Sequence, residues 1–107
     1  SRGFMRQKLA YSQGVLEGLT LEKFDLVTKN GIRIRNMKLT NMMYSLKQPG
    51  YMQHVTNYHR AVDQLLDAST EKDLARSTKA YQGVLQSCVD CHRDYRTEQR
   101  KVAGAKG

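Results

Sequence analysis

The sequence is poor in residues that interrupt helices or cross-link a chain. It contains one proline, Pro49, only two cysteines, and no low-complexity segment or repeat. No apolar run approaches the ~20 residues that a membrane-spanning helix requires. Residues 1–10 lack an initiator methionine and an apolar stretch of signal-peptide type, so an export signal, if there was one, has already been removed. These absences predict a mostly helical chain without a membrane span.

The charge of the chain is strongly positive but not concentrated in one place. The 107 residues include 18 Lys and Arg against 10 Asp and Glu, which gives a net charge of +8. A nucleic-acid-binding arm would be a denser basic block, so we do not expect nucleic acid as a partner. An acidic protein partner fits the dispersed charge. The length allows one hydrophobic core, which predicts a single domain over 1–107.

The first half of the chain shows two helical patterns. Residues 3–18 predict a first helix, with Gly18 as its left-handed end and Thr20 as the cap of the next helix. Its apolar stripe has helical spacing and comprises Met5, Leu9, Ser12, Leu16 and Leu19. Residues 21–46 predict a second helix that could be broken near Gly31.

The second half predicts two more helices after a turn at Lys47–Gly50. The third helix has an inward stripe of Met52, Val55, His59, Val62 and Leu66. The fourth follows Thr70 as its cap, and the residues after Arg100 should fray. Its stripe is the most regular of the four and comprises Leu74, Thr78, Tyr81, Leu85, Cys88, His92 and Tyr95. The predicted fold is all-α, an antiparallel up-down-up-down four-helix bundle.

Both cysteines lie in the stretch SCVDCHRDYR, with His92 directly after the second. A disulfide between Cys88 and Cys91 would close a very small loop and constrain the unfolded chain little. A thioredoxin-like dithiol belongs at the start of a helix beside a βαβ unit, whereas this pair lies late in a helix. Zinc would need further ligands, for which only His54 and His59 are available. The C-x-x-C-H spacing matches the attachment signature of c-type haem, with two packed cysteines beside a surface histidine as the alternative.

The position of this motif carries a family resemblance. On a helix Cys88 and His92 lie one above the other, and Cys91 is one step round from His92. A four-helix bundle with C-x-x-C-H near its C-terminal end, followed by RDYR, resembles the class II c-type cytochromes, the cytochrome c′ group. The resemblance implies one haem c on the fourth helix, bound covalently through both cysteines, with His92 as the proximal iron ligand.

The resemblance also implies a first-helix residue on the other haem face. Met5 there would coordinate the iron and make it low-spin, whereas Phe4 would be an apolar lid. His59 would give a bis-histidine haem, with a hydrogen-bonded core residue as the alternative. Arg96 matches a basic residue that lies beside the haem in the family, or is a solvated last-turn arginine. The residues expected to line the haem pocket are Phe4, Leu9, His59, Tyr81, Leu85, Tyr95 and Arg96.

Three functions follow from this resemblance. The first is a one-electron carrier, six-coordinate through His92 and Met5, that docks on acidic redox partners. The second is a five-coordinate protein that binds NO or CO. The third, a haem enzyme, lacks an evident acid–base set. We therefore expect a non-enzymatic electron-transfer cytochrome in the periplasm or an equivalent exported compartment, with gas binding as the alternative. A dimer through the first two helices, common in the family, is possible.

Overall fold

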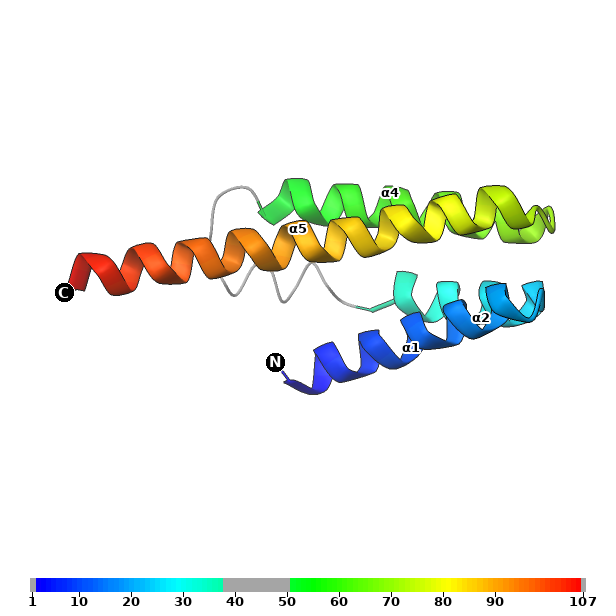
Figure 1. The fold of residues 1–107 in the computed structure, drawn as a ribbon, viewed down its shortest axis with the longest axis horizontal. Coiled ribbons are helices and arrows are strands. Elements are labelled where there is room, and N and C mark those ends of the chain that lie inside the picture. Colours follow the sequence, from blue (N-terminus) through cyan, green and yellow to red (C-terminus); the bar gives the residue numbers. More distant parts are fainter. Residues whose placement is uncertain (1, 38–50, 107) are drawn as a thin grey trace.

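A computed structural model describes residues 2–37 and 51–106 of the chain. Within these ranges all regular structure is helical, and Figure 1 shows the helices running alternately in opposite directions along the molecule. Their bounds are Arg2–Thr20 for α1, Phe24–Arg35 for α2, Tyr51–Thr70 for α4 and Leu74–Lys106 for α5. The prediction of an all-α, antiparallel up-down-up-down bundle is confirmed. None of the described helices is long and apolar enough to cross a membrane.

The helices form two hairpins, α1–α2 and α4–α5, that pack side by side. α2 packs against α4 along the middle of the molecule, while the contact between α1 and α5 is the smallest of the four. One core joins all four helices, and its large members are Val15, Leu19, Val27, Ile34, Val55, Tyr58, Val62, Leu65, Tyr81 and Val84. The loose α1–α5 side therefore leaves space at one end of the core.

The stripe that α1 buries differs from the predicted one. Leu9 and Leu16, predicted to face inward, are exposed, and Lys8 and Val15 are buried instead. Both stripes contain Ser12 and Leu19 and have helical spacing, and between these residues they differ by one position, so periodicity alone cannot choose between them. The packing of α2 decides the choice. A Cβ at Gly18 would lie 2.8 Å from Val27 Cγ2, so the face around this glycine is the one that α2 approaches closely.

The same shift of one position affects parts of α4 and α5. On α4, Val55 and Val62 are buried as predicted, whereas Met52 is exposed and Tyr58 replaces its neighbour His59 in the core. On α5, Thr78 and Leu85 are exposed although both were predicted inward. The residues that α5 buries in their place are Ser77, Ala80 and Val84, next to the correctly predicted Tyr81.

Three predicted boundaries are wrong. α2 ends at Arg35, where the Asn36 N–H bonds to the Ile32 carbonyl at 2.9 Å, so one helix does not run from 21 to 46. Gly31 lies inside α2 and does not break it. α5 continues as helix to Lys106, beyond the point where fraying was predicted. The predicted turn at Lys47–Gly50 lies outside the described residues.

The hairpin turns also differ from the predicted capping. Thr20 and Thr70 are the last helical residues of α1 and α4, and the hydroxyl of each donates to a carbonyl of its own helix. Neither threonine therefore caps the following helix. Gly18 is helical and not left-handed; the positive φ angles belong to Glu22 and Lys72, at 54° and 56°. Both helices thus end with a charged residue in the left-handed region.

The two hairpins repeat each other at a separation of fifty positions, although the sequence shows no repeat. The buried residues correspond in pairs, Lys8 with Tyr58, Ser12 with Val62, Val15 with Leu65, Val27 with Ser77, Gly31 with Tyr81 and Ile34 with Val84. Because few of these pairs are chemically alike, the repeat is visible only in burial and backbone geometry. The bundle is therefore built from two similar hairpins with different side chains.

Candidate functional site

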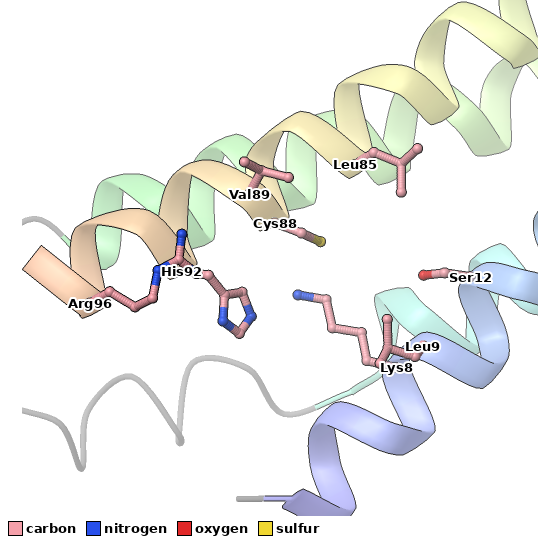
Figure 2. A pocket seen from close by; sticks show the side chains of 8 residues that line it. All are labelled: Lys8, Leu9, Ser12, Leu85, Cys88, Val89, His92 and Arg96. Carbon is pink, nitrogen blue, oxygen red and sulfur yellow. The ribbon is translucent and has the colours of Figure 1, made fainter.

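A cavity of about 290 Å³ lies between α1 and α5, on the side where these helices meet least. It is partly open to solvent. Figure 2 shows the side chains around it, with Lys8 and His92 reaching in from opposite walls. The residues that line the cavity are Lys8, Leu9, Ser12, Leu85, Cys88, Val89, His92 and Arg96. Four of the predicted pocket or ligand residues are thereby brought together, namely Leu9, Leu85, His92 and Arg96, along with one of the two cysteines.

The α5 wall presents Cys88 and His92 one helical turn apart. Burial lowers the pKa of His92, and the nearby positive charges of Lys8 and Arg96 lower it further. The lowered pKa favours the neutral imidazole, which is the form that coordinates a metal ion. This wall therefore offers a thiol and a neutral imidazole to the same space.

Cys91 has a different environment from Cys88. It packs against the edge of the hydrophobic core and does not line the cavity itself. Burial raises the pKa of its thiol, and Cys88 and Asp94 act in the same direction, while Lys8 opposes them. Both thiols are free and half-buried. The two are therefore available for covalent attachment, with Cys88 facing the cavity directly.

Three apolar side chains also line the cavity. Leu9 is 57% exposed, Leu85 44% and Val89 54%, although all three are large hydrophobic side chains. Leu9 lines the cavity from α1, and Leu85 and Val89 line it from α5. A group of exposed apolar side chains around a concave surface marks a binding site for an apolar ligand. With the thiol and the imidazole beside them, these residues fit a haem, which is a large, mostly apolar ring with a metal at its centre.

The α1 wall contains a residue that sequence reasoning missed. Lys8 is only 6% exposed, and its Nζ lies 4.3 Å from the centre of the Tyr58 ring. Beside it, the Ser12 carbonyl accepts a 3.0 Å hydrogen bond from the buried Tyr81 hydroxyl, which ties α5 to α1. The missed signal was a stripe of Lys8, Ser12, Val15 and Leu19, which has the same helical spacing as the stripe we chose.

His59, predicted as a pocket residue, does not line this cavity. It is on α4, facing Arg35 of α2 and Asp63, and not the α1–α5 side. Burial and the charge of Arg35 lower its pKa, against the opposing effect of Asp63. At the separation of fifty positions that relates the two hairpins, His59 corresponds to Leu9 and Arg35 to Leu85. The surface between α2 and α4 that corresponds to the cavity therefore has charged or titratable side chains at positions where the cavity has leucines.

The remaining predicted residues are placed in part. Tyr81 is buried and bonds Ser12 next to the cavity without lining it. The side chains of Phe4, Met5 and Tyr95 lie outside what the structure describes, although all three positions belong to helices. Arg96 is exposed at the end of the cavity wall.

The zinc alternative for the cysteine pair has no structural support. The side chain of His54 is 17% exposed and its Nε2 lies 2.7 Å from Asp94 Oδ2, so it joins α4 to α5. Within the described ranges, no three His, Cys, Asp or Glu side chains gather as a metal site would require.

Comparison with known proteins identifies the family. The family model described as Cytochrome C′ matches residues 35–96, which is more than half of the chain and includes the C-x-x-C-H motif. Neither the search of curated proteins nor the search of solved structures found a match. The all-helical fold agrees with the matched family. The chain belongs to the cytochrome c′ family, whose prosthetic group is a covalently bound haem c.

Proposed function

We propose that the protein is a monohaem cytochrome that transfers single electrons. In this proposal Cys88 and Cys91 attach the haem through thioether bonds, and His92 is the proximal iron ligand. The observation that carries the proposal is the cavity between α1 and α5, where Cys88 and His92 share one space with apolar walls. Haem bound there would supply the one-electron change between ferric and ferrous iron.

The side chains of the chain itself would hold and shield this group. The neutral imidazole of His92 faces the middle of the cavity, and Leu9, Leu85 and Val89 would cover the ring and exclude water from it. Their burial against haem would remove exposed apolar surface, at about 25 cal/mol per Å². Arg96, at the open end, is placed to meet a negatively charged group near solvent.

The net charge of +8 supports an acidic redox protein as the partner. Complementary charge speeds a brief encounter without requiring tight binding, as electron transfer demands. Because members of this family are typically exported, we place the protein in the periplasm or an equivalent compartment. We propose a carrier and not an enzyme, because one metal site without an acid–base pair suits electron transfer.

Met5 is our proposed second iron ligand. It lies on α1 one turn before Lys8, so both residues belong to the helix that forms the wall opposite His92. Thioether ligation opposite histidine favours the ferrous state and raises the reduction potential. Six-coordinate iron would then exchange electrons without binding other ligands readily.

Binding of NO or CO by five-coordinate iron is the second candidate function. The observation in its favour is that none of the described side chains that α1 contributes to the cavity is a methionine or a histidine. A haem whose second face met only Leu9, Lys8 and Ser12 could leave room for a small ligand.

One set of measurements tests the proposal. Mass spectrometry of the denatured chain, produced with haem-maturation machinery, should show one added haem, and the Cys88→Ala variant at most one thioether. The ferric spectrum should be low-spin with a weak sulfur-to-iron band in the near infrared. Met5→Ala should turn the iron high-spin and speed CO binding, while Met52→Ala, exposed on α4, should change neither. If the iron of the unaltered protein is high-spin, gas binding is the better proposal and electron transfer is contradicted. A chain that carries no haem would contradict both proposals.

A further inference from the structure

Lys8 is a buried cation without a counter-charge in the described part of the chain. The residue is 6% exposed, and no described carboxylate lies within ion-pair distance of its ammonium. The ammonium lies over the face of the Tyr58 ring, with Nζ 4.3 Å from the ring centre. Burying a charge is costly unless an opposite charge or several hydrogen bonds compensate for it, and one aromatic face compensates only in part.

Two groups that could serve as a counter-charge for this ammonium do not. Burial raises the pKa of Tyr58, so the phenol beside the ammonium keeps its proton and stays neutral. The Asp94 carboxylate, which like Lys8 affects the pKa of Cys91, is 57% exposed and lies 2.7 Å from Nε2 of His54 on α4. The positive charge of Lys8 is therefore not neutralised by either of these side chains.

The charge of Lys8 acts on the α5 side chains that are proposed to hold the haem. Its ammonium points into the cavity from the wall opposite His92 (Figure 2). In addition to the effect of burial, it lowers the pKa of His92, and it opposes the rise that burial causes in the pKa of Cys91. Packing does not require a cation here, because the equivalent position of the other hairpin is Tyr58, an aromatic core residue. An iron ion held by His92 would lie in the same positive field.

We propose that Lys8 raises the reduction potential of this site, because its buried charge favours ferrous over ferric iron without touching the metal. This inference rests on the proposed haem site, but not on the identity of the second iron ligand. Ferric haem has one positive charge more than ferrous haem, so an uncompensated cation nearby disfavours the ferric state. Lys8 would thus act in the same direction as thioether ligation by Met5.

The test compares the haem-loaded protein with Lys8→Gln, which removes the charge and introduces no thioether that could bind iron. The reduction potential of each protein is measured by spectroelectrochemical titration at fixed pH and ionic strength. We expect Lys8→Gln to lower the ratio of ferrous to ferric protein at a fixed applied potential about tenfold, which is 59 mV for a one-electron couple. A unit charge about 10 Å away has roughly this effect in a partly shielded site.

Three further variants make the result specific. Lys8→Arg should keep the ratio within about twofold, because it keeps the charge. Lys79→Gln removes an exposed lysine of α5 outside the cavity and should also change the ratio less than about twofold, since solvent screens its charge. Lys8→Leu provides a second neutral variant if Lys8→Gln does not fold, as judged by circular dichroism.

Urea unfolding of the ferric and ferrous proteins gives a second readout, which a loss of packing alone would not produce. Covalently attached haem stays on the unfolded chain, where solvent screens the charge of Lys8. Lys8→Gln should therefore stabilise the ferric protein relative to the ferrous one, and the ratio of their unfolding equilibrium constants should change about tenfold, as the thermodynamic cycle requires. A loss of packing would change both forms equally.

Two results would overturn the inference. If Lys8→Gln leaves the reduction potential unchanged, the charge of Lys8 is neutralised in the loaded protein, as by a haem carboxylate. If Lys8→Gln converts low-spin iron to high-spin, Lys8 is itself an iron ligand and does not act through its charge alone. The added haem mass is measured first in every variant. A chain that carries no haem contradicts both the proposed function and this inference, whereas a loaded chain with an unchanged potential contradicts only the role of Lys8.

Discussion

The α1–α2 and α4–α5 hairpins share one turn geometry but use different residues to build it. At the end of each first helix, the N–H of the left-handed residue bonds three positions back, from Glu22 to Leu19 and from Lys72 to Ser69. The next N–H bonds five positions back, at 2.8 Å in one turn and 3.0 Å in the other. This is the Schellman ending of a helix, which normally has glycine at the left-handed position. The backbone thus repeats where the sequence does not.

The hairpins differ in how they fill the space next to this turn. In α1–α2 a glycine, Gly18, faces the large Val27, whereas in α4–α5 the corresponding residues are Ala68 and the small Ser77. The second hairpin thus has a larger side chain on its first helix, Ala68 for Gly18, and a smaller one on its second helix, Ser77 for Val27. The difference teaches that close helix approach is conserved between the hairpins through total volume and not through residue type.

The hairpins also differ in function. The two cysteines and the proximal histidine proposed to hold the haem belong to α5, whereas the α1–α2 hairpin contributes a cavity wall and the proposed second ligand Met5, both through α1. The contact between α1 and α5 is the smallest of the helix contacts. Haem bound between these two helices would therefore be the main link between them. The α4–α5 hairpin, by contrast, is joined along its length by the largest of the helix contacts.

The largest expected effect comes from removing the haem, which should make the hairpins behave differently. We expect the Cys88→Ala/Cys91→Ala variant to lose at least about 3 kcal/mol of unfolding free energy, as for loss of a tightly bound ligand. Hydrogen exchange should accelerate strongly in α1 and little in α4, because only α1 loses its link to α5. The amides of α4 serve as the control within the same molecule. Equal acceleration in both helices would show that haem does not bridge the hairpins as proposed.

The second prediction tests whether a larger side chain fits at position 18 beside Val27. A methyl group at Gly18 would lie 2.9 Å from the Val27 backbone nitrogen, which cannot rotate away. Gly18→Ala should therefore lower the unfolding free energy by about 1–3 kcal/mol, measured by urea denaturation. Gly83→Ala is the matched control. Its new methyl would meet only Ala61 Cβ at 3.7 Å, so this change should stabilise the helix by about 0.5–1 kcal/mol.

A double variant tests whether volume is the reason for the loss at Gly18. Adding Val27→Ser reproduces the pair that the second hairpin contains, Ala68 with Ser77. Each single change should destabilise, and the double variant should be less destabilised than their sum by about 1 kcal/mol, since the two side chains share one space. Strict additivity would contradict this explanation.

The two turns should also differ in how much helix capping contributes to stability, and this effect should be smaller than those above. Asp73 accepts a 3.0 Å hydrogen bond from the Arg76 N–H at the start of α5, whereas Lys23 makes no such bond at the start of α2. Asp73→Ala should therefore cost about 1 kcal/mol, and Lys23→Ala should change the stability by only about 0.3 kcal/mol. Thermal unfolding of the two variants in parallel measures the difference. Equal losses would mean that the Asp73 cap contributes nothing.

The fold was predictable from sequence to the level of its architecture. Sparse punctuation and helical spacing predicted the antiparallel four-helix bundle, and C-x-x-C-H near the end predicted the family. The choice of buried stripe was not predictable, because stripes one position apart have the same period. Only the close approach at Gly18 and the paired burial of the hairpins fix that choice, and both depend on tertiary contacts.

The site was predictable where its residues form a local motif and not where they come from other helices. Cys88 and His92 lie together because helical geometry alone puts them there. The stripe of His59 on α4 gives no information on which neighbour α4 faces, so its place outside the α1–α5 cavity could not be read from the sequence. Lys8 was missed because a lysine is normally exposed, so only its position in a stripe with Val15 could have indicated its burial.

The smallest effect should be the same in both turns. Glu22 and Lys72 have φ angles of 54° and 56°, where a side chain other than glycine costs about 1 kcal/mol. Glycine removes this strain but loses more entropy on folding, so Glu22→Gly and Lys72→Gly should each stabilise by about 0.5 kcal/mol. Both side chains are exposed, so little else is lost. Lys79→Gly, at an exposed site inside α5, should instead destabilise by about 1 kcal/mol. Urea denaturation of the three variants decides the matter: a gain in only one turn would show that the shared hydrogen bonds do not make the two backbones equally strained.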